Sequence, residues 1–356
     1  MFQYMSAREA AKKWNISQRR VSILCAENRI PNVAMLGNMW LIPRNAKKPD
    51  DARIKRNAEA KERNTRPFIK WAGGKGQLLE VLKANLPKGM GTKITKYAEP
   101  FVGGGALLFA LLSEYALEEV YIGDTNKELI NVYTVIRDNC EALLSELHTI
   151  QEEYEKLEIE AQQAYYYSKR DEYNELRLST DTAIKKATLF IFLNKTCFNG
   201  LYRVNKAGKF NVPAGRYKNP MICDKENIIN VSQKLQKVKI RACDYHEVQS
   251  FADKNTLVYF DPPYRPLNTT STFTSYTENQ FNDDDQIELA NFYKKLSDYG
   301  VNVLMSNSDP HNVDINDVFF DDLYKDFNIQ RINATRVINS KSEKRGNVSE
   351  LLIKNY

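Results

Sequence analysis

The residues best suited to chemistry are an acid, two prolines and a tyrosine, Asp261-Pro262-Pro263-Tyr264, which directly follow the apolar run 257–260. That run predicts a buried strand. Prolines have fixed φ angles and no N–H, so the turn presents the Asp261 carboxylate and the Pro262 carbonyl as acceptors without competing donors. Two rigid acceptors beside an aromatic ring suit a ring-bound amine, whose N–H groups they would hold while its lone pair faces an electrophile. The alternative is a purely structural turn.

A glycine-rich turn indicates a nucleotide-like ligand. The stretch 97–108, YAEPFVGGGALL, reads as a strand, a glycine turn and the start of a helix. Glycines let a ligand approach the backbone, and a helix N-terminus lies behind them. About twenty residues later, Val120–Asp124 ends a second strand with a carboxylate that could bind ribose hydroxyls. This spacing fits NAD, FAD or S-adenosylmethionine, and the absence of GxGxxG disfavours NAD.

The segment 68–77, FIKWAGGKGQ, adds an indole and a cation. A nucleoside triphosphatase would need GxxxxGK[ST], but Ile69 replaces the first glycine and Gly76 follows the lysine, so a P-loop is disfavoured. Trp71 offers a stacking surface, and Lys75 could pair with the carboxylate of a zwitterionic cofactor.

The elements that must position these residues follow an α/β pattern from Pro67 onward. Strands are predicted at 97–101, 120–124, 256–260 and 301–306, with a closing pair near 328–338 and 348–355. Ligands bind at the carboxyl ends of parallel strands, where Asp124 and Asp261 would lie. A long Tyr-rich stretch, helical up to Asn194 and then loop-like, reads as an insertion between two halves of the sheet.

The loop 195–218 has the composition of a nucleic-acid contact. It holds six basic residues, four aromatics and no acid. Basic residues interleaved with aromatics suit phosphates and bases, and asparagine amides can read adenine edges. A solvated basic loop is the alternative. The predicted DNA-contacting residues here are Lys195, Asn199, Tyr202, Arg203, Asn205, Lys206, Lys209, Asn211 and Arg216, with Lys344 and Arg345 in a second basic tip.

The N-terminal part is the basic part of the chain: residues 1–66 hold 15 of the 51 Lys and Arg but 6 of the 45 Asp and Glu. A basic excess of this kind is typical of contact with a polyanion. Residues 44–66 are charged, lack apolar periodicity and predict a linker.

Residues 1–43 predict a small DNA-binding module. Ser6 and Glu9 form a capping box before a helix, Ser17 is a candidate N-cap for a second helix, and two short strands surround Gly37. The order resembles the winged helix-turn-helix of excisionase and MerR-type modules, with Arg19 and Arg20 at the start of the recognition helix. The alternative is a helical hairpin that caps the next domain.

Composition excludes other classes of protein. The N-terminus shows no apolar core of a secretory signal peptide, and no run of about 20 apolar residues is present. We therefore expect no membrane contact and a cytoplasmic, nucleoid-associated location. Five scattered cysteines without CxxC are typical of reduced thiols, and three distant histidines disfavour zinc. No cysteine follows a proline, which excludes cytosine C5 methylation.

The ordered motifs FIKWAGGKGQLL, YAEPFVGGGALLF, GDTN, NKTCFNGLYRVNKAGKFNVPAGRY, DPPY and SNSD resemble those of Dam-type adenine DNA methyltransferases, the α-group, across residues 67–356. The resemblance implies a Rossmann-like, mostly parallel seven-stranded sheet with helices on both faces and a target-recognition insertion at about 135–245. It implies catalysis by Asp261, Pro262, Pro263 and Tyr264. It implies that S-adenosylmethionine is bound by Trp71, Ala72, Gly73, Gly74, Lys75, Glu99, Pro100, Phe101, Gly103, Gly105, Asp124, Asn126, Asp244, Tyr245 and Asp261, of which Asp244 and Tyr245 hold its adenine.

The expected reaction is direct methyl transfer to the N6 amine of an adenine flipped out of duplex DNA and stacked on Tyr264, within GATC, without a metal. The enzyme is expected to act as a monomer on DNA. The sequence leaves open a restriction–modification system with a cognate endonuclease, a phage system and a housekeeping system. The competing interpretations are a methyltransferase for RNA or a protein amide, which commonly has Asn where Asp261 stands, a non-catalytic regulator using residues 1–43, and a nicotinamide oxidoreductase.

Overall fold

The computed structural model describes residues 4–14, 16–26, 30–37, 39–48, 65–265, 281–335 and 347–356. The chain divides into two compact units, Met1–Arg63 and Asn64–Tyr356. Across the described ranges, no helix combines the length and the apolar character that a membrane crossing requires.

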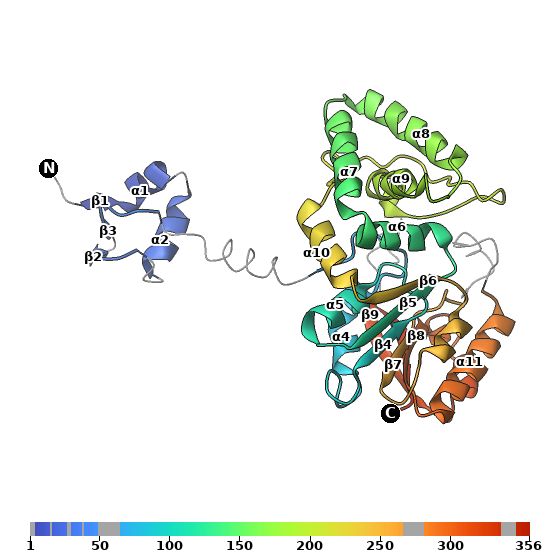
Figure 1. Ribbon diagram of the computed structural model, residues 1–356. Helices are drawn as coiled ribbons and strands as arrows, with labels where there is room; N and C mark the ends of the chain where they lie inside the picture. Colours follow the sequence, from blue (N-terminus) through green and yellow to red (C-terminus); the bar gives the residue numbers. More distant parts are fainter. Residues whose placement is uncertain are drawn as a thin grey trace. The chain divides into compact units, whose positions relative to one another are not determined.

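In its described residues, the first unit contains two helices and a small antiparallel sheet (Figure 1). Its elements are β1 (Tyr4–Ser6), α1 (Ala7–Trp14), α2 (Gln18–Ala26), β2 (Ala34–Leu36) and β3 (Met39–Pro43). The strand order is β1-β3-β2. The two helices and the hairpin lie where the sequence predicts them, and β1 is an additional short strand. A DNA-binding role as a winged helix-turn-helix stays a prediction.

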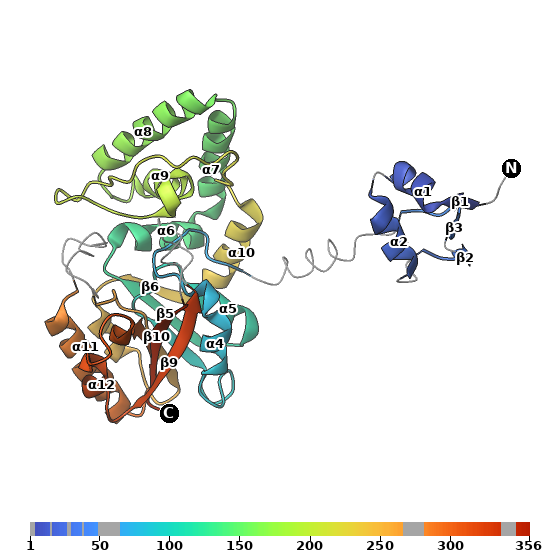
Figure 2. The same cartoon turned by 180° about the vertical axis from the view of Figure 1, so that it is seen from behind.

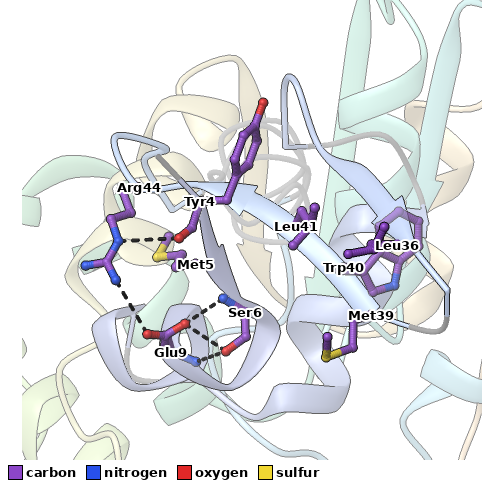
Figure 3. A pocket seen from close by; sticks show the side chains of 9 residues that line it. All are labelled: Tyr4, Met5, Ser6, Glu9, Leu36, Met39, Trp40, Leu41 and Arg44. Atoms are coloured by element: carbon purple, nitrogen blue, oxygen red, sulfur yellow. Dashed lines mark hydrogen bonds and ion pairs between the residues drawn. The ribbon is translucent and has the colours of Figure 1, made fainter. Parts of the chain in front are cut away.

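Both predicted helix caps of this unit are confirmed. Glu9 Oε2 accepts from the Ser6 backbone N–H at 2.7 Å, and Ser6 Oγ accepts from the Glu9 N–H at 3.3 Å. Ser17 Oγ accepts from the Arg20 N–H at 3.2 Å. Figure 3 shows the capping box at one end of a shallow surface pocket of about 420 Å³, with Leu36 and Met39 of the hairpin at the other. The hairpin exposes three large apolar side chains, Met35, Leu36 and Met39.

The second unit is built on a seven-stranded sheet in the order β6-β5-β4-β7-β8-β10-β9. The strands are β4 (Lys96–Glu99), β5 (Glu119–Asp124), β6 (Val238–Ala242), β7 (Thr256–Phe260), β8 (Asn302–Ser308), β9 (Asn328–Thr335) and β10 (Asn347–Lys354). Strands β6, β5, β4, β7 and β8 are parallel, and β10 runs antiparallel to both β8 and β9. The predicted α/β class and the mostly parallel sheet are confirmed.

Strand β6 corrects one prediction. The insertion was expected to extend to about residue 245, but residues 238–242 pair in parallel with β5 as an edge strand of the main sheet. The stretch VKIRA alternates charged with apolar residues, and three of its five side chains are exposed. An edge strand with one open face lacks the apolar run by which buried strands are recognised.

Helices cover both faces of the sheet (Figures 1 and 2). Their bounds are α4 (Leu79–Ala84), α5 (Ala106–Glu114), α6 (Lys127–Asp138), α10 (Lys225–Leu235), α11 (Asp283–Asp298) and α12 (Phe319–Leu323). Side chains alternate between faces along β7: Leu257 and Tyr259 join the core with α5 and α6, whereas Val258 and Phe260 join the core with α11 and α12. This two-sided burial explains why β7 reads as a continuous apolar run.

The helical insertion consists of α7 (Cys140–Glu155), α8 (Ile159–Glu175) and α9 (Ala183–Thr196), which gather at one end of the unit in Figure 1. Helix α9 packs against α6, α7 and α8, while α6 also packs on β5 and β6. The insertion is therefore fastened to the sheet through α6. The loop after α9 folds back on itself. Two isolated antiparallel β-bridges, Cys197 with Ala214 and Val204 with Phe210, hold it by backbone pairing.

Candidate active site

Three acids lie where neighbouring parallel strands end. Glu99 is the last residue of β4, Asp124 is the last residue of β5, and Asp261 follows β7. Because β5, β4 and β7 are adjacent and parallel, their carboxyl ends share one edge of the sheet. The structure therefore brings these predicted site residues to a common edge.

Lys75 is the buried cation of this edge. It begins the short 3-10 helix η1 (Lys75–Gln77), and its side chain is 5% exposed. Its Nζ lies 3.0 Å from Asp261 Oδ1 and 3.6 Å from Glu350 Oε2, and it donates to the Gly73 carbonyl at 3.1 Å. The sequence predicted a cofactor carboxylate as its partner. In the structure two protein carboxylates compensate its charge, because an unpaired buried ammonium is strongly unfavourable.

Asp261 is held by hydrogen bonds at this edge of the sheet. Its Oδ1 also accepts from Ser306 Oγ of β8 at 3.0 Å, and Ser306 contacts the Tyr259 hydroxyl at 2.8 Å. Burial raises the pKa of Asp261 above its ordinary value, while Lys75 and Ser306 act in the opposite direction. The Asp261 carboxylate is thus held by two partners while 20% of its side-chain surface stays exposed.

The Pro-Pro-Tyr turn is held from two sides. Gln286 of α11 donates to the Pro263 carbonyl at 3.1 Å, and Pro262 is buried. The Tyr264 hydroxyl accepts from Lys75 at 2.5 Å and donates to Glu350 Oε2 at 2.6 Å. The Lys75 ammonium also lies 4.4 Å from the centre of the Tyr264 ring. The turn therefore presents a carboxylate and a partly exposed ring in a fixed relation.

Glu99 is a buried acid with a raised pKa. It is 3% exposed, and its Oε2 accepts from the Tyr97 hydroxyl at 2.8 Å. Burial raises the pKa of Glu99 to about 8, and the nearby negative charge of Asp261 acts in the same direction. A protonated Glu99 adds no further negative charge beside Asp261. Pro100, which follows it, is buried.

The glycine turn needs its glycines for two reasons. Gly103 and Gly105 have φ of 45° and 68°, in the left-handed region that favours glycine. A Cβ at Gly103 would lie 2.7 Å from Trp71 Cδ1, and one at Gly105 would lie 2.7 Å from the Tyr133 hydroxyl. The turn is thus shaped to pack directly against the indole of Trp71.

Asp124 anchors the same turn. Its Oδ2 accepts from the Gly103 N–H at 3.3 Å, and its Oδ1 accepts from the Asn126 N–H at 2.9 Å. Burial raises the pKa of Asp124 to about 6. Asn126 in turn caps α6, where its side chain accepts from the N–H groups of Glu128 and Leu129.

Trp71 connects the glycine turn to the insertion, with Ala72 partly exposed and Gly73 and Gly74 exposed beside it. Its ring stacks on Tyr202 at 5.5 Å between centroids, and Tyr202 stacks on Phe190 at 5.2 Å. Tyr202 is only 7% exposed. This ring therefore packs beside Trp71 and leaves little surface for a base, and the DNA contact of Tyr202 stays a prediction.

The predicted adenine-binding pair is arranged unequally. Tyr245 is 5% exposed, with its ring packed against Phe101 at 5.3 Å and against His246 at 4.1 Å. Asp244 is exposed, and its Oδ1 accepts from the His246 backbone N–H at 3.0 Å as the cap of η3 (Tyr245–Ser250). Asp244 and the partly exposed Phe101 are thus the accessible groups, and the buried Tyr245 ring packs against Phe101.

The remaining predicted DNA contacts differ in exposure. Arg203 Nε donates to Asn211 Oδ1 at 2.7 Å, and Asn205 Oδ1 closes a turn by accepting from the N–H groups of Ala207 and Lys209. Exposed side chains are Arg19, Asn199, Asn205, Lys206, Lys209 and Arg216, and partly buried ones are Arg20, Lys195, Arg203 and Asn211. Lys344 and Arg345 lie outside the described residues.

Glu350 and Ser306 are site residues that the sequence reasoning missed. Glu350 stands directly before Leu351, Leu352 and Ile353, which are all buried in β10. An acid inside an apolar strand was the available signal, because a buried charge requires a partner. Ser306 begins the SNSD motif at the end of β8.

Comparisons with known proteins identify relatives over most of the chain. The family of D12 class N6 adenine-specific DNA methyltransferases matches residues 71–338. The chain is 50% identical over 293 residues to the type II methyltransferase M.MjaIII of Methanocaldococcus jannaschii. That alignment covers 82% of this chain and 99% of the relative. The chain is also 41% identical over 295 residues to the type II methyltransferase M1.LlaDCHI of Lactococcus lactis subsp. cremoris, covering 82% and 96%.

A third relative carries a different name. The chain is 34% identical over 292 residues to the DNA adenine methylase of Salmonella typhi, with 82% of this chain and 95% of that protein covered. A family match across more than half of the chain and relatives aligned over nearly their whole length lead to one conclusion: the chain belongs to the D12 class of N6 adenine-specific DNA methyltransferases.

Proposed function

We propose that this adenine-specific DNA methyltransferase uses S-adenosylmethionine and acts on an adenine turned out of the duplex, with Asp261 and Tyr264 as the residues that hold it. The observation that carries the proposal is the direction of Asp261. Its carboxylate is fixed by Lys75 and Ser306 at the sheet edge, beside the rigid proline turn and a partly exposed tyrosine ring.

The residues at the glycine turn fit S-adenosylmethionine. Asp124 offers a carboxylate to ribose hydroxyls, and the glycine turn that it anchors leads directly into the N-terminus of α5. Phe101 and Asp244 are the accessible groups for its adenine. When bound, the cofactor supplies an electrophilic methyl group on a sulfonium.

The target amine would be activated by position. The Asp261 carboxylate and the Pro262 carbonyl accept its two N–H groups, which draws electron density onto the nitrogen. The Tyr264 ring stacks on the base and keeps it in place. The bound cofactor would supply the methyl group to the nitrogen that Asp261 and Pro262 hold, and the proton that this nitrogen gives up would pass to solvent. Orientation and charge complementarity supply the acceleration, without a covalent enzyme intermediate.

Target recognition is assigned to the loop after α9. Lys206, Lys209 and Arg216 are exposed there and can contact phosphates, and Asn199 is exposed for base contact. We propose GATC as the target because the loop sequence resembles that of GATC-specific Dam-type enzymes.

The first unit is proposed to add DNA affinity through the start of α2, where Arg19 is exposed. Two of the relatives are named type II methyltransferases. On that basis we propose a restriction–modification role, with a cognate endonuclease as functional partner and the methyltransferase acting as a monomer.

Label transfer tests the proposed function. The protein is incubated with S-adenosylmethionine tritiated in its methyl group and, in separate reactions, with unmethylated plasmid DNA, RNA or protein. We expect label in DNA alone, with sequencing placing N6-methyladenine within GATC. Label confined to RNA or protein would refute the substrate, and methyladenine at another sequence would refute only the target.

A further inference from the structure

Glu350 is a carboxylate placed inside the sheet. In β10 it lies opposite Ser308 of β8 and Ile332 of β9, and its side chain is 21% exposed. The next three residues of the strand are fully buried. Removing a carboxylate from water is costly unless it is paired, so its partners indicate why it stands there.

Those partners are Tyr264 and Lys75, two residues of the candidate active site. Glu350 Oε2 accepts from the Tyr264 hydroxyl at 2.6 Å and lies 3.6 Å from Lys75 Nζ. The Tyr264 hydroxyl accepts from Lys75 at the same time. A phenol has one proton to donate, and here that proton goes to Glu350. The acceptor is a carboxylate oxygen, which is typical of short and strong hydrogen bonds.

Tyr264 needs this outside support. Pro262 and Pro263 fix the backbone of the turn, but they do not fix the side-chain torsions of the next residue. The hydroxyl at the far end of the ring is the point at which the ring direction can be set. Glu350 reaches that point from a strand more than eighty residues further along the chain.

We propose that Glu350 is a positioning residue for methyl transfer: by accepting the Tyr264 hydroxyl it sets the direction of the ring on which the target adenine stacks. The inference rests on the proposed role of Tyr264. Small displacements of an aligned substrate slow an oriented reaction strongly, so the cost of losing Glu350 falls on the methyl-transfer step.

Single-turnover methylation of unmethylated plasmid DNA, at saturating protein and cofactor, tests the inference. For Glu350→Ala we expect methyl transfer about 10- to 100-fold slower with the plasmid Kd nearly unchanged. Glu350→Gln keeps an acceptor oxygen and should restore most of the rate. Glu350→Met keeps the side-chain length without a strong acceptor, and it takes the place of the alanine variant if that variant does not fold.

A double-mutant cycle shows whether Glu350 acts through the tyrosine. Tyr264→Phe keeps the ring and removes the hydroxyl, so Glu350→Ala in that background should cause little further loss. Glu119→Gln is the matched control: this carboxylate begins β5, at the opposite end of that strand from Asp124, and pairs with Lys239. It should keep the wild-type rate.

Two results would overturn the inference. One is a Glu350→Ala enzyme as fast as wild type, and the other is a set of losses that multiply fully in the double variant. If the wild-type protein labels no DNA, the proposed function fails and this inference fails with it. If wild type labels DNA and the Glu350 variants match it, only the inference fails.

Discussion

At the scale of single residues, the site is a set of carboxylates made compatible by one cation and one proton. Lys75 compensates Asp261 and Glu350, and burial keeps Glu99 protonated at neutral pH. Without these two features, three negative charges would lie close together at the sheet edge. If Asp261 holds the target amine as proposed, that amine meets a carboxylate already fixed by Lys75 and Ser306.

Replacement of Asp261 tests its role as the holder of the target amine. We expect Asp261→Ala to lower the single-turnover rate by at least about 1000-fold, the upper range for the loss of one preorganised polar group. Duplex binding should survive, because the exposed basic loop lies elsewhere. Tritium transfer measures the rate, and fluorescence anisotropy measures the Kd. If affinity and activity disappear together, Asp261 is a structural residue.

Replacement of Glu99 tests its protonation. The folded pKa is about 8 against an ordinary 4.5, so its contribution to stability is full below 4.5 and is lost as the pH rises through 8. Glu99→Gln resembles the protonated acid and lacks this loss. The free energy of unfolding of Glu99→Gln minus that of wild type should therefore grow between pH 5 and pH 9, by at least about 1 kcal/mol.

Urea unfolding at the two pH values measures that difference. Glu119→Gln is the control, because the pKa of Glu119 is lowered by Lys239 and its proton is already lost at pH 5. The difference between that variant and wild type should not grow toward pH 9. An equally flat difference for Glu99→Gln would mean that Glu99 is ionised in the folded protein.

At the scale of elements, the α9 helix and its loop form one assembly with the Trp71 segment. The Asn194 side chain donates to the carbonyls of Lys70 and Gly200 and accepts from the Lys70 N–H. Tyr202 adds its stack on Trp71. Only the outer part of the loop remains free to meet DNA, and there the hairpin around Asn205 presents two lysines.

The hairpin lysines should set part of the salt dependence of DNA binding. Each lost phosphate contact lowers the slope of log K against log[salt] by roughly 0.9. We expect Lys206→Ala with Lys209→Ala to lower it by about 1 to 2 and to weaken binding similarly on all sequences. Lys294→Ala with Lys295→Ala on α11 removes the same charge from an exposed helix and should leave the slope unchanged. Equal slopes for both double variants would exclude the hairpin from the DNA interface.

At the scale of the whole molecule, the catalytic unit has its own cores and the N-terminal unit has a separate one. The M.MjaIII methyltransferase is aligned over 99% of its length with 82% of this chain. The family match begins at residue 71. Methyl transfer is therefore assigned to the second unit, and the role of the first unit in DNA affinity stays a proposal.

Removal of residues 1–43 tests that division. We expect the maximal rate of methyl transfer to be kept, while plasmid affinity falls and its salt slope becomes smaller, because a basic module is lost. Arg19→Ala in the full chain should change the slope in the same direction by a smaller amount. A salt slope that is identical with and without residues 1–43 would show that this unit does not contact DNA.

The sequence by itself determined the class of fold, the strand that carries Asp261 and the two helix caps of the first unit. Strand β7 lies at the predicted residues, and the Ser6 and Ser17 caps were predicted correctly. The reason is that burial on both faces, turn geometry and capping are local properties, which a few adjacent residues encode. The edge strand β6 was not predicted, because an exposed strand lacks the continuous apolar run of a buried one.

The tertiary structure alone decided which side chains meet. Lys75, Asp261, Tyr264 and Glu350 come from three segments far apart in the chain, and their contacts follow from the order β4-β7-β8-β10, which no local pattern encodes. Tyr202 shows the same limit, since its position in an aromatic loop predicted exposure while packing against Trp71 buried it. A buried charge or ring is placed by the partners that compensate it, and those partners are brought together only by the packed fold.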